Sequence, residues 1–197
     1  MASGGVAGVV LAAGPSQRFR SEIPKQVQPF AGEPLVRRIS RRALASRLTE
    51  VVVVVGNRSD LVRKALGDLA VGVVENPGFA AGQSSSVRVG LAAIDPGAAA
   101  AMFLPVDQPF LTTEVIDRLV GVWEGTGGPI VVPVHQGRRG APAVIGRSLF
   151  GELAGISGDE GGRQLFARHG GEIVEVSLSS PKPLLDIDSL EDLEQLS

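Results

Sequence analysis

The chain has 197 residues, of which 44% are hydrophobic and 20% are charged, and it contains no cysteine. This length is typical of one domain, the hydrophobic content excludes an intrinsically disordered chain, and the lack of cysteine excludes disulfides, thiolate zinc sites and cysteine nucleophiles. The formal charge of −2, from 19 basic and 21 acidic side chains, argues against a nucleic-acid-binding surface. We therefore predict a single domain over residues 1–197, with a small molecule as its main partner.

Neither a membrane span nor a secretion signal is expected. The longest apolar stretches, at 6–13 and 98–106, fall well short of the roughly 20 residues that cross a bilayer. No basic side chain precedes the first apolar run, whereas a signal peptide would carry one. We expect a cytoplasmic protein with no membrane partner.

Short valine-rich runs alternate with helical patterns along the chain. The runs are apolar on both faces, which is typical of strands in a parallel sheet covered by helices on both sides. In chain order, the pattern predicts strands at 6–11, 51–55, 71–74, 100–104, 130–134, 143–145 and 173–176, and helices at 34–47, 59–66, 84–94, 112–123, 159–169 and 189–196. Ser59, Thr112 and Ser189 are candidate N-caps of three of these helices. The alternation predicts an α/β fold with a doubly wound, mostly parallel sheet, whose ligands bind beyond the carboxyl ends of the strands.

The loop after the first predicted strand combines small residues with positive charge. Its sequence is LAAGPSQRF at 11–19, and Lys25 follows shortly afterwards. The loop is neither a dinucleotide-binding GxGxxG motif nor a P-loop. Approachable backbone N–H groups, together with Arg18 and Lys25, could bind a triphosphate. The alternative is an ordinary strand-to-helix connection with two surface cations.

Three aspartates follow apolar segments. Asp107 comes directly after the predicted strand at 100–104, where its carboxylate could hold a magnesium ion. Strand periodicity would place Asp186 and Asp188 on one face of a second such segment. The alternatives are a turn or cap carboxylate at Asp107 and a helix cap at Asp188.

Five segments, in this order, resemble the motif series of the MobA-like nucleotidyltransferases, particularly the branch that adds cytidylate to the molybdenum cofactor. They are 11–19 with Lys25, NPGFAAGQSSSV at 76–87, DQP at 107–109, SGDEGGR at 157–163 and DIDSLEDL at 186–193. The resemblance implies a Rossmann-like fold with helices on both faces of the sheet. It also implies Mg²⁺-dependent transfer of CMP from CTP to the phosphate of molybdopterin, with release of pyrophosphate.

The resemblance also assigns roles to residues of this chain. It implies catalytic roles for Arg18, Lys25 and Asp107. Asp107, Asp188 and Asp186 would form the metal site or its surroundings. The nucleotide would be bound by Leu11, Ala12, Ala13, Gly14, Ser16, Arg18, Lys25, Gly82, Gln83 and Ser84. The LAAG form of the first loop is typical of the cytidylyl branch, and the methyl group of Ala13 would favour a pyrimidine over a purine.

One departure from the family keeps other acceptors open. The sequence Gly140-Ala141-Pro142 stands where family members commonly carry a polar middle residue. One alternative is a nucleotidyltransferase that uses GTP as its donor, or a sugar phosphate or another small phosphate as its acceptor. The other alternative is a non-catalytic carrier of molybdopterin. A client molybdoenzyme or an accessory protein is a possible further partner.

Two groups of residues have no assigned chemistry. Arg37, Arg38, Arg41 and Arg42 recur at helical spacing, which is typical of a solvated helix face, with partner docking as the alternative. His135 is predicted to lie in a loop, with contact to the acceptor as the alternative.

Overall fold

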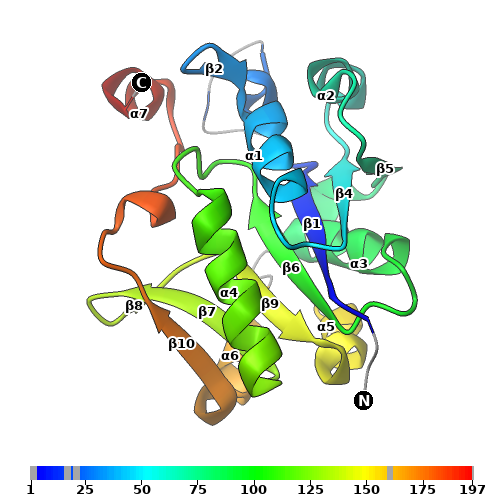
Figure 1. Ribbon diagram of the computed structural model, residues 1–197. Helices are drawn as coiled ribbons and strands as arrows, with labels where there is room; N and C mark the ends of the chain where they lie inside the picture. The colour runs from blue at the N-terminus through cyan, green and yellow to red at the C-terminus, as the bar shows by residue number, and fades with distance from the viewer. Residues whose placement is uncertain (1–3, 16–18, 20–22, 159–161, 197) are drawn as a thin grey trace.

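A computed structural model describes residues 4–15, 19, 23–158 and 162–196. Within these residues the main sheet has eight strands, in the order β10-β7-β9-β6-β1-β4-β5, with β8 paired to β7 (Figure 1). The strands are β1 (Val6–Ala12), β4 (Glu50–Val55), β5 (Gly72–Glu75), β6 (Ala100–Pro105), β7 (Ile130–His135), β8 (Arg138–Arg139), β9 (Ala143–Gly146) and β10 (Ile173–Ser177). All seven predicted strands are present. The prediction of a mostly parallel sheet is confirmed, because only β9 and β8 pair antiparallel with their neighbours.

Helices cover both faces of the sheet, as predicted. They are α1 (Leu35–Leu44), α2 (Ser59–Leu66), α3 (Gln83–Ala93), α4 (Thr113–Thr126), α5 (Phe150–Gly155), α6 (Arg163–Arg168) and α7 (Leu190–Leu196). Buried side chains of α1, α2, α4 and α7 form one hydrophobic cluster, and those of α3, α5 and α6 form another on the opposite face. Helix α5 was not predicted, because its six residues are too few to give a clear helical period.

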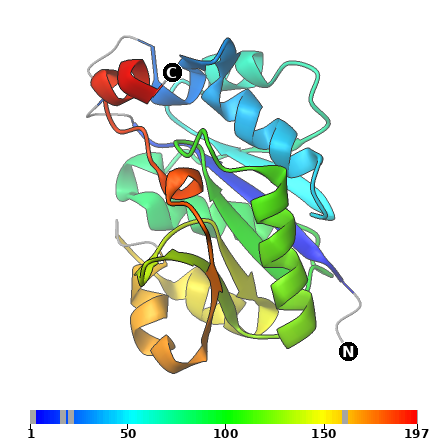
Figure 2. The same ribbon diagram turned by 60° about the vertical axis from the view of Figure 1, so that its left-hand side comes forward.

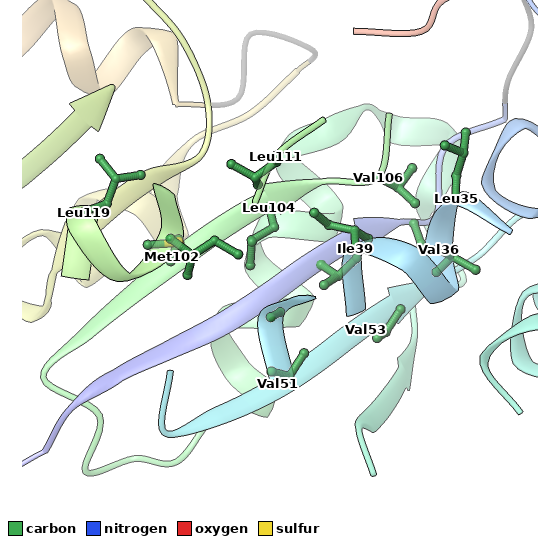
Figure 3. Close-up of a cluster of buried hydrophobic side chains, with 14 of the residues drawn as sticks. Leu35, Val36, Ile39, Val51, Val53, Met102, Leu104, Val106, Leu111 and Leu119 are labelled. Carbon is green, nitrogen blue, oxygen red and sulfur yellow. The ribbon is translucent and has the colours of Figure 1, made fainter. Parts of the chain in front are cut away.

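Strand periodicity explains how one sheet supplies both clusters. In β4, Val51 and Val53 point into the first cluster, whereas Val52 and Val54 point into the second. Figure 3 shows the first cluster, where valines of β4 meet side chains of α1 and the β6 residues Met102 and Leu104. Both faces must be apolar because neither faces water, which accounts for the continuous valine run in the sequence.

The helix ends confirm two of the three predicted N-caps. The Thr112 hydroxyl accepts from the backbone N–H of Val115 at the start of α4, and the Ser189 hydroxyl accepts from the N–H of Asp192 at the start of α7. The prediction for Ser59 is wrong. Arg58 occupies the cap position of α2 with a φ of 51°, and the Ser59 hydroxyl donates to the Glu75 carboxylate instead.

A short hairpin links β1 to α1 and was not predicted. It consists of β2 (Pro29–Phe30) and β3 (Glu33–Pro34), and it is preceded by the 3₁₀ turn η2 (Lys25–Val27). Ala31 and Gly32 between the strands have φ values of 49° and 81°, as a tight two-residue hairpin requires. Figure 2 shows that this hairpin and α7 lie at the same end of the sheet.

No helix in the described part of the chain is both long and apolar enough to span a bilayer. The cytoplasmic location stays a prediction.

Candidate active site

A cleft of about 1490 Å³ opens beyond the carboxyl ends of β1 and β6. This is the position that the fold predicts for a ligand site. The cleft is lined by segments from six parts of the chain, and its lining residues include Leu11, Ala13, Gly14, Lys25, Gly82, Gln83, Asp107, Asp186 and Asp188. Most of the predicted site residues that the structure describes therefore meet in one cavity.

The loop after β1 forms one wall of this cleft. The carbonyl of Gly14 accepts a hydrogen bond of 2.7 Å from the amide of Gln26, which is itself buried. This bond fixes the loop to the turn that carries Lys25. Ala12 is buried in the core instead of lining the cleft. Ser16 and Arg18 lie outside the described residues.

Ala13 lines the cleft but has almost no exposed surface. It is 1% exposed, and its carbonyl accepts from the backbone N–H of Asn57. A Cβ atom added to Gly56 would come within 2.9 Å of the Ala13 Cβ and within 2.8 Å of the Phe79 Cβ. The Ala13 methyl group therefore packs under the turn after β4, and glycine at position 56 permits this close approach.

Lys25 and two of the predicted aspartates form an ion cluster at the floor of the cleft. The Lys25 Nζ atom lies 2.7 Å from Asp107 Oδ2 and 3.4 Å from Asp188 Oδ1. The side chains of Lys25 and Asp107 are 14% and 24% exposed, so this pair is partly shielded from water. The backbone N–H of Ile187 donates to the Asp107 carbonyl over 2.9 Å, which anchors the segment carrying Asp188 beside the loop after β6.

Asp186 flanks this cluster at the rim. Its Oδ1 atom accepts from Gln108 Nε2 over 3.0 Å. Desolvation and the negative charge of Asp107 raise the pKa of Asp186, although the Gln108 hydrogen bond acts in the opposite direction. Partial burial is the larger cause of this pKa shift, and the proximity of a second carboxylate adds to it.

The start of α3 forms a second wall. Gly82, at a φ of 99°, precedes Gln83, and both line the cleft, whereas the Ser84 side chain is buried and does not. The buried Asn76 side chain donates to Ser85 Oγ over 2.8 Å, and Ser85 Oγ in turn donates to the Gly82 carbonyl over 2.7 Å. The predicted motif at 76–87 is therefore a hydrogen-bonded loop that fixes the backbone of Gly82 and Gln83.

The far wall contains Gly140, Ala141 and His135, which the sequence linked to the acceptor, together with residues that were not predicted. It is lined by the turn between β7 and β8 and by the segment before Asp186, through His135, Gln136, Arg138, Gly140, Ala141, Leu184 and Leu185. A Cβ atom on Gly140 would lie 3.0 Å from a Leu184 methyl group, so these two segments are closely packed. His135 ends β7 instead of lying in a loop, and its Nδ1 is 2.9 Å from the Leu178 carbonyl. Because a carbonyl only accepts, Nδ1 must carry the proton.

The donor set of the floor fits a hard divalent cation that arrives with phosphates. Carboxylate oxygens of Asp107 and Asp188 both reach one positive centre, the Lys25 ammonium group. The described residues contain no group of three histidine, cysteine or acidic side chains that could hold a metal alone. Magnesium typically takes one or two protein carboxylates together with ligand phosphates and water. The two aspartates satisfy that requirement.

The family model of the MobA-like NTP transferase domain matches residues 8–173. Protein Rv0371c of Mycobacterium tuberculosis H37Rv is 30% identical, with 98% of each chain covered and a TM-score of 0.84. A structure of Rv0371c in complex with manganese is 28% identical, covers 98% of this chain and 97% of that one, and has a TM-score of 0.81.

Among curated proteins, the bifunctional protein GlmU of Paraburkholderia phytofirmans is 33% identical over 150 residues, which are 75% of this chain and 32% of GlmU. The chain spans between about a quarter and a third of the length of the curated relatives it matches first. Because the family model covers most of the chain, this protein belongs to the MobA-like NTP transferase family.

Proposed function

We propose that the protein transfers CMP from CTP to the phosphate of molybdopterin and releases pyrophosphate, with Mg²⁺ as its metal. The observation that carries this proposal is the ion cluster of Lys25, Asp107 and Asp188 beside the Gly14 loop. It combines a cation for phosphates with two carboxylates for a metal, in a cleft large enough for two substrates. Membership of a nucleotidyltransferase family supports the same reaction type.

The proposed reaction needs no histidine base. An oxygen of the acceptor phosphate attacks the α-phosphorus of CTP, and the bond from that phosphorus to the bridging oxygen of pyrophosphate breaks. A phosphate monoester is largely dianionic near pH 7, so its oxygen is already a nucleophile. The chain has to position the two substrates and to neutralise charge.

Each charged residue then has a defined task. Lys25 would stabilise charge on the departing pyrophosphate, and the same role is proposed for Arg18, which lies outside the described residues. Asp107 and Asp188 would hold the metal. When bound, the metal would neutralise phosphate oxygens as a Lewis acid. Asp186, tied to Gln108, would add negative charge next to that site.

The preference for CTP depends on the wall at the start of α3. Gln83 and Ser86 line the cleft there and together offer both donors and acceptors, which the edge of cytosine can satisfy in pairs. A site with polar groups matched to one base leaves them unpaired against another, and this penalty gives the discrimination. The methyl group of Ala13 packs against Gly56 and is 1% exposed, so the prediction that it narrows the cleft against a purine is wrong.

The far wall supports an acceptor with a flat ring. Ala141, Leu184 and Leu185 are apolar, whereas His135 and Arg138 supply polar groups nearby. This mixture suits a ring system with hydrogen-bonding edges and a phosphate tail. A sugar phosphate or another small phosphate is the second candidate, because Ala141 offers no polar side chain to the acceptor.

The experiment is a pyrophosphate-release assay with CTP or GTP, with Mg²⁺ or Mn²⁺, and with molybdopterin or a panel of sugar phosphates. We expect release only when molybdopterin is present, a higher kcat/KM for CTP than for GTP, and a cytidylylated product by mass spectrometry. A preference for GTP would refute the cytidylyl assignment but not nucleotidyl transfer. Release of pyrophosphate with a sugar phosphate but not with molybdopterin would show that the acceptor is the sugar phosphate. Binding of molybdopterin without any release would indicate a carrier, with a client enzyme as the next partner to test.

A further inference from the structure

The four arginines of α1 differ in their partners. Arg37 donates to the Leu66 carbonyl at the end of α2 and pairs with Asp68. Arg41 and Arg38 lie 2.9 Å and 3.8 Å from Glu33, respectively. The partners of Arg37 and Arg41 are not part of the loop after β6. The other two arginines, Arg38 and Arg42, lie one turn apart on a different stripe of the helix and point to the loop after β6.

Arg38 and Arg42 bind backbone carbonyls of that loop. Arg38 Nε lies 2.9 Å from the Pro109 carbonyl, and Arg42 Nη1 lies 2.6 Å from the same carbonyl. Arg42 Nη1 also donates to the Leu111 carbonyl over 2.5 Å. These carbonyls are two and four residues beyond Asp107. The two arginines therefore fix the backbone that leads directly out of the proposed metal site.

The side of the loop that faces the cleft is coupled to the other aspartates. Gln108 donates to Asp186, and the Asp107 carbonyl accepts from Ile187 next to Asp188. A shift of the loop would therefore move Asp107 and loosen the contacts of the segment that carries the other two carboxylates.

The ring of Phe110 holds the same loop from a third direction. It stacks edge to face on Phe30 with a centroid distance of 5.2 Å, and Lys182 lies 4.7 Å from its centroid. Arg38 lies 5.3 Å from the Phe30 ring, so the arginine pair and the aromatic pair form one continuous support.

Arg42 carries the largest share of this support. Leu111 is fully buried in the first hydrophobic cluster, where Figure 3 shows it near Leu104, so its carbonyl cannot be hydrated in place of the lost bond. Arg42 is half-buried, and desolvation lowers the pKa of its guanidinium group. Both bonds come from one terminal nitrogen, Nη1, which the planar guanidinium group holds in a fixed orientation. A lysine ammonium group on a flexible stem would hold the two carbonyls less well.

We propose, on the basis of the proposed function, that Arg42 together with Arg38 is a positioning residue that sets the place of the Asp107 carboxylate and so determines the affinity for the divalent metal. Neither arginine lines the cleft. Their effect passes through the backbone from Pro109 to Asp107.

The test compares Arg42→Ala and Arg42→Lys with Arg37→Ala, a control on the same helix that also removes a hydrogen bond from an arginine to a backbone carbonyl, that of Leu66, outside the loop after β6. Mn²⁺ affinity is measured by electron paramagnetic resonance with CTP present, and CTP affinity is measured separately with EDTA. We expect Arg42→Ala to weaken Mn²⁺ binding by about 10- to 100-fold, as changes behind a metal ligand typically do. Arg42→Lys should be intermediate, Arg37→Ala should resemble wild type, and CTP affinity in EDTA should change less than about twofold in all three.

Hydrogen exchange in the metal-free proteins provides a second readout. Peptides covering 104–112 and 183–190 should exchange about 10- to 100-fold faster in Arg42→Ala, because hydrogen bonds to charged groups are among the strongest in proteins. The proposal would be overturned if these peptides of Arg42→Ala exchanged at the wild-type rate. It would also be overturned if the folded Arg42→Ala protein bound Mn²⁺ with unchanged affinity. If Arg42→Ala does not fold, Arg42→Lys and Arg38→Ala decide it by the same two measurements.

The outcomes also separate this proposal from the proposed function. Wild-type protein that binds Mn²⁺ but releases no pyrophosphate would refute the function and leave the role of Arg42 to be decided by Mn²⁺ affinity. Wild-type protein that binds no Mn²⁺ would refute both.

Discussion

Asp107→Asn removes one charge from the ion cluster and leaves the shape of the side chain almost unchanged. The amide can still accept a hydrogen bond from Lys25 through its oxygen. The Lys25 ammonium group also keeps Asp188, 3.4 Å away, as a second partner. The substitution therefore tests the charge of Asp107 with little disturbance of packing.

The effect on stability should be small. The attraction between unit charges 2.7 Å apart is about 6 kcal/mol at an effective dielectric constant of about 20. Desolvation of two groups that are only 14% and 24% exposed offsets most of this attraction. We expect the free energy of unfolding to fall by about 1–2 kcal/mol, since Asp188 remains.

The effect on the reaction should be much larger. Loss of one preorganised group that stabilises charge typically lowers kcat by about 100- to 1000-fold. We therefore expect Asp107→Asn to lower kcat/KM for CTP by that factor at a limiting concentration of Mg²⁺, while the far-UV circular dichroism spectrum stays unchanged.

A matched control is Asp68→Asn, which likewise weakens an ion pair of an aspartate, here with Arg37, at an exposed position that does not line the cleft. It should retain full activity. Near-normal turnover of Asp107→Asn at limiting Mg²⁺ would refute the role of Asp107 in metal binding. An equal loss of activity in Asp68→Asn would show that the assay reports stability instead.

Three further predictions concern stability. Desolvation and neighbouring negative charge raise the pKa of Asp186, so its ionised form disfavours folding at neutral pH. Asp186→Asn should therefore raise the free energy of unfolding at pH 7 by less than about 1 kcal/mol, because the side chain lies at the rim, where contact with solvent weakens both effects. This gain should disappear as the pH falls below about 4. A gain that persists at low pH would contradict this reasoning. Hydrogen bonds to two flanking glutamates raise the pKa of His169, so its contribution is complete below pH of about 6.5 and is lost as the pH rises through the raised pKa. The Tm difference between wild type and His169→Asn should shrink across that range, and a constant difference would exclude the charged pair. In Gly90→Ala the new Cβ would lie 2.3 Å from a Val9 methyl group, and overpacking should outweigh the gain in helix propensity, with a net loss of about 1–2 kcal/mol in chemical denaturation. Gly125→Ala in α4, which has no neighbour within 4 Å, is the control and should be neutral or stabilising.

The order and type of the elements could be predicted from the sequence because they depend on local periodicity. Short apolar runs, most of them rich in valine, identified every strand of the parallel part of the sheet, and α2 begins and ends where its pattern predicted. The same logic placed Asp107 at the carboxyl end of β6, because any residue that follows such a strand emerges at that edge. The short hairpin at Pro29–Pro34 and the six residues of α5 had too few residues to show a period.

The arrangement of the site depended on contacts that no local pattern contains. Lys25 meets Asp107 across 82 positions and Asp188 across 163 positions. Helical spacing showed that the four α1 arginines share one side of the helix and suggested a solvated face. It could not show that Arg38 and Arg42 face carbonyls of the loop after β6, because those partners come from a segment roughly 70 residues away. The sequence by itself thus determined which side chains reach the edge of the sheet. Only the tertiary structure decided which of these side chains meet. The segments after β6 and β10 fold onto that edge and so set the distances between the charges. Coulomb interactions are strong only at such short distances.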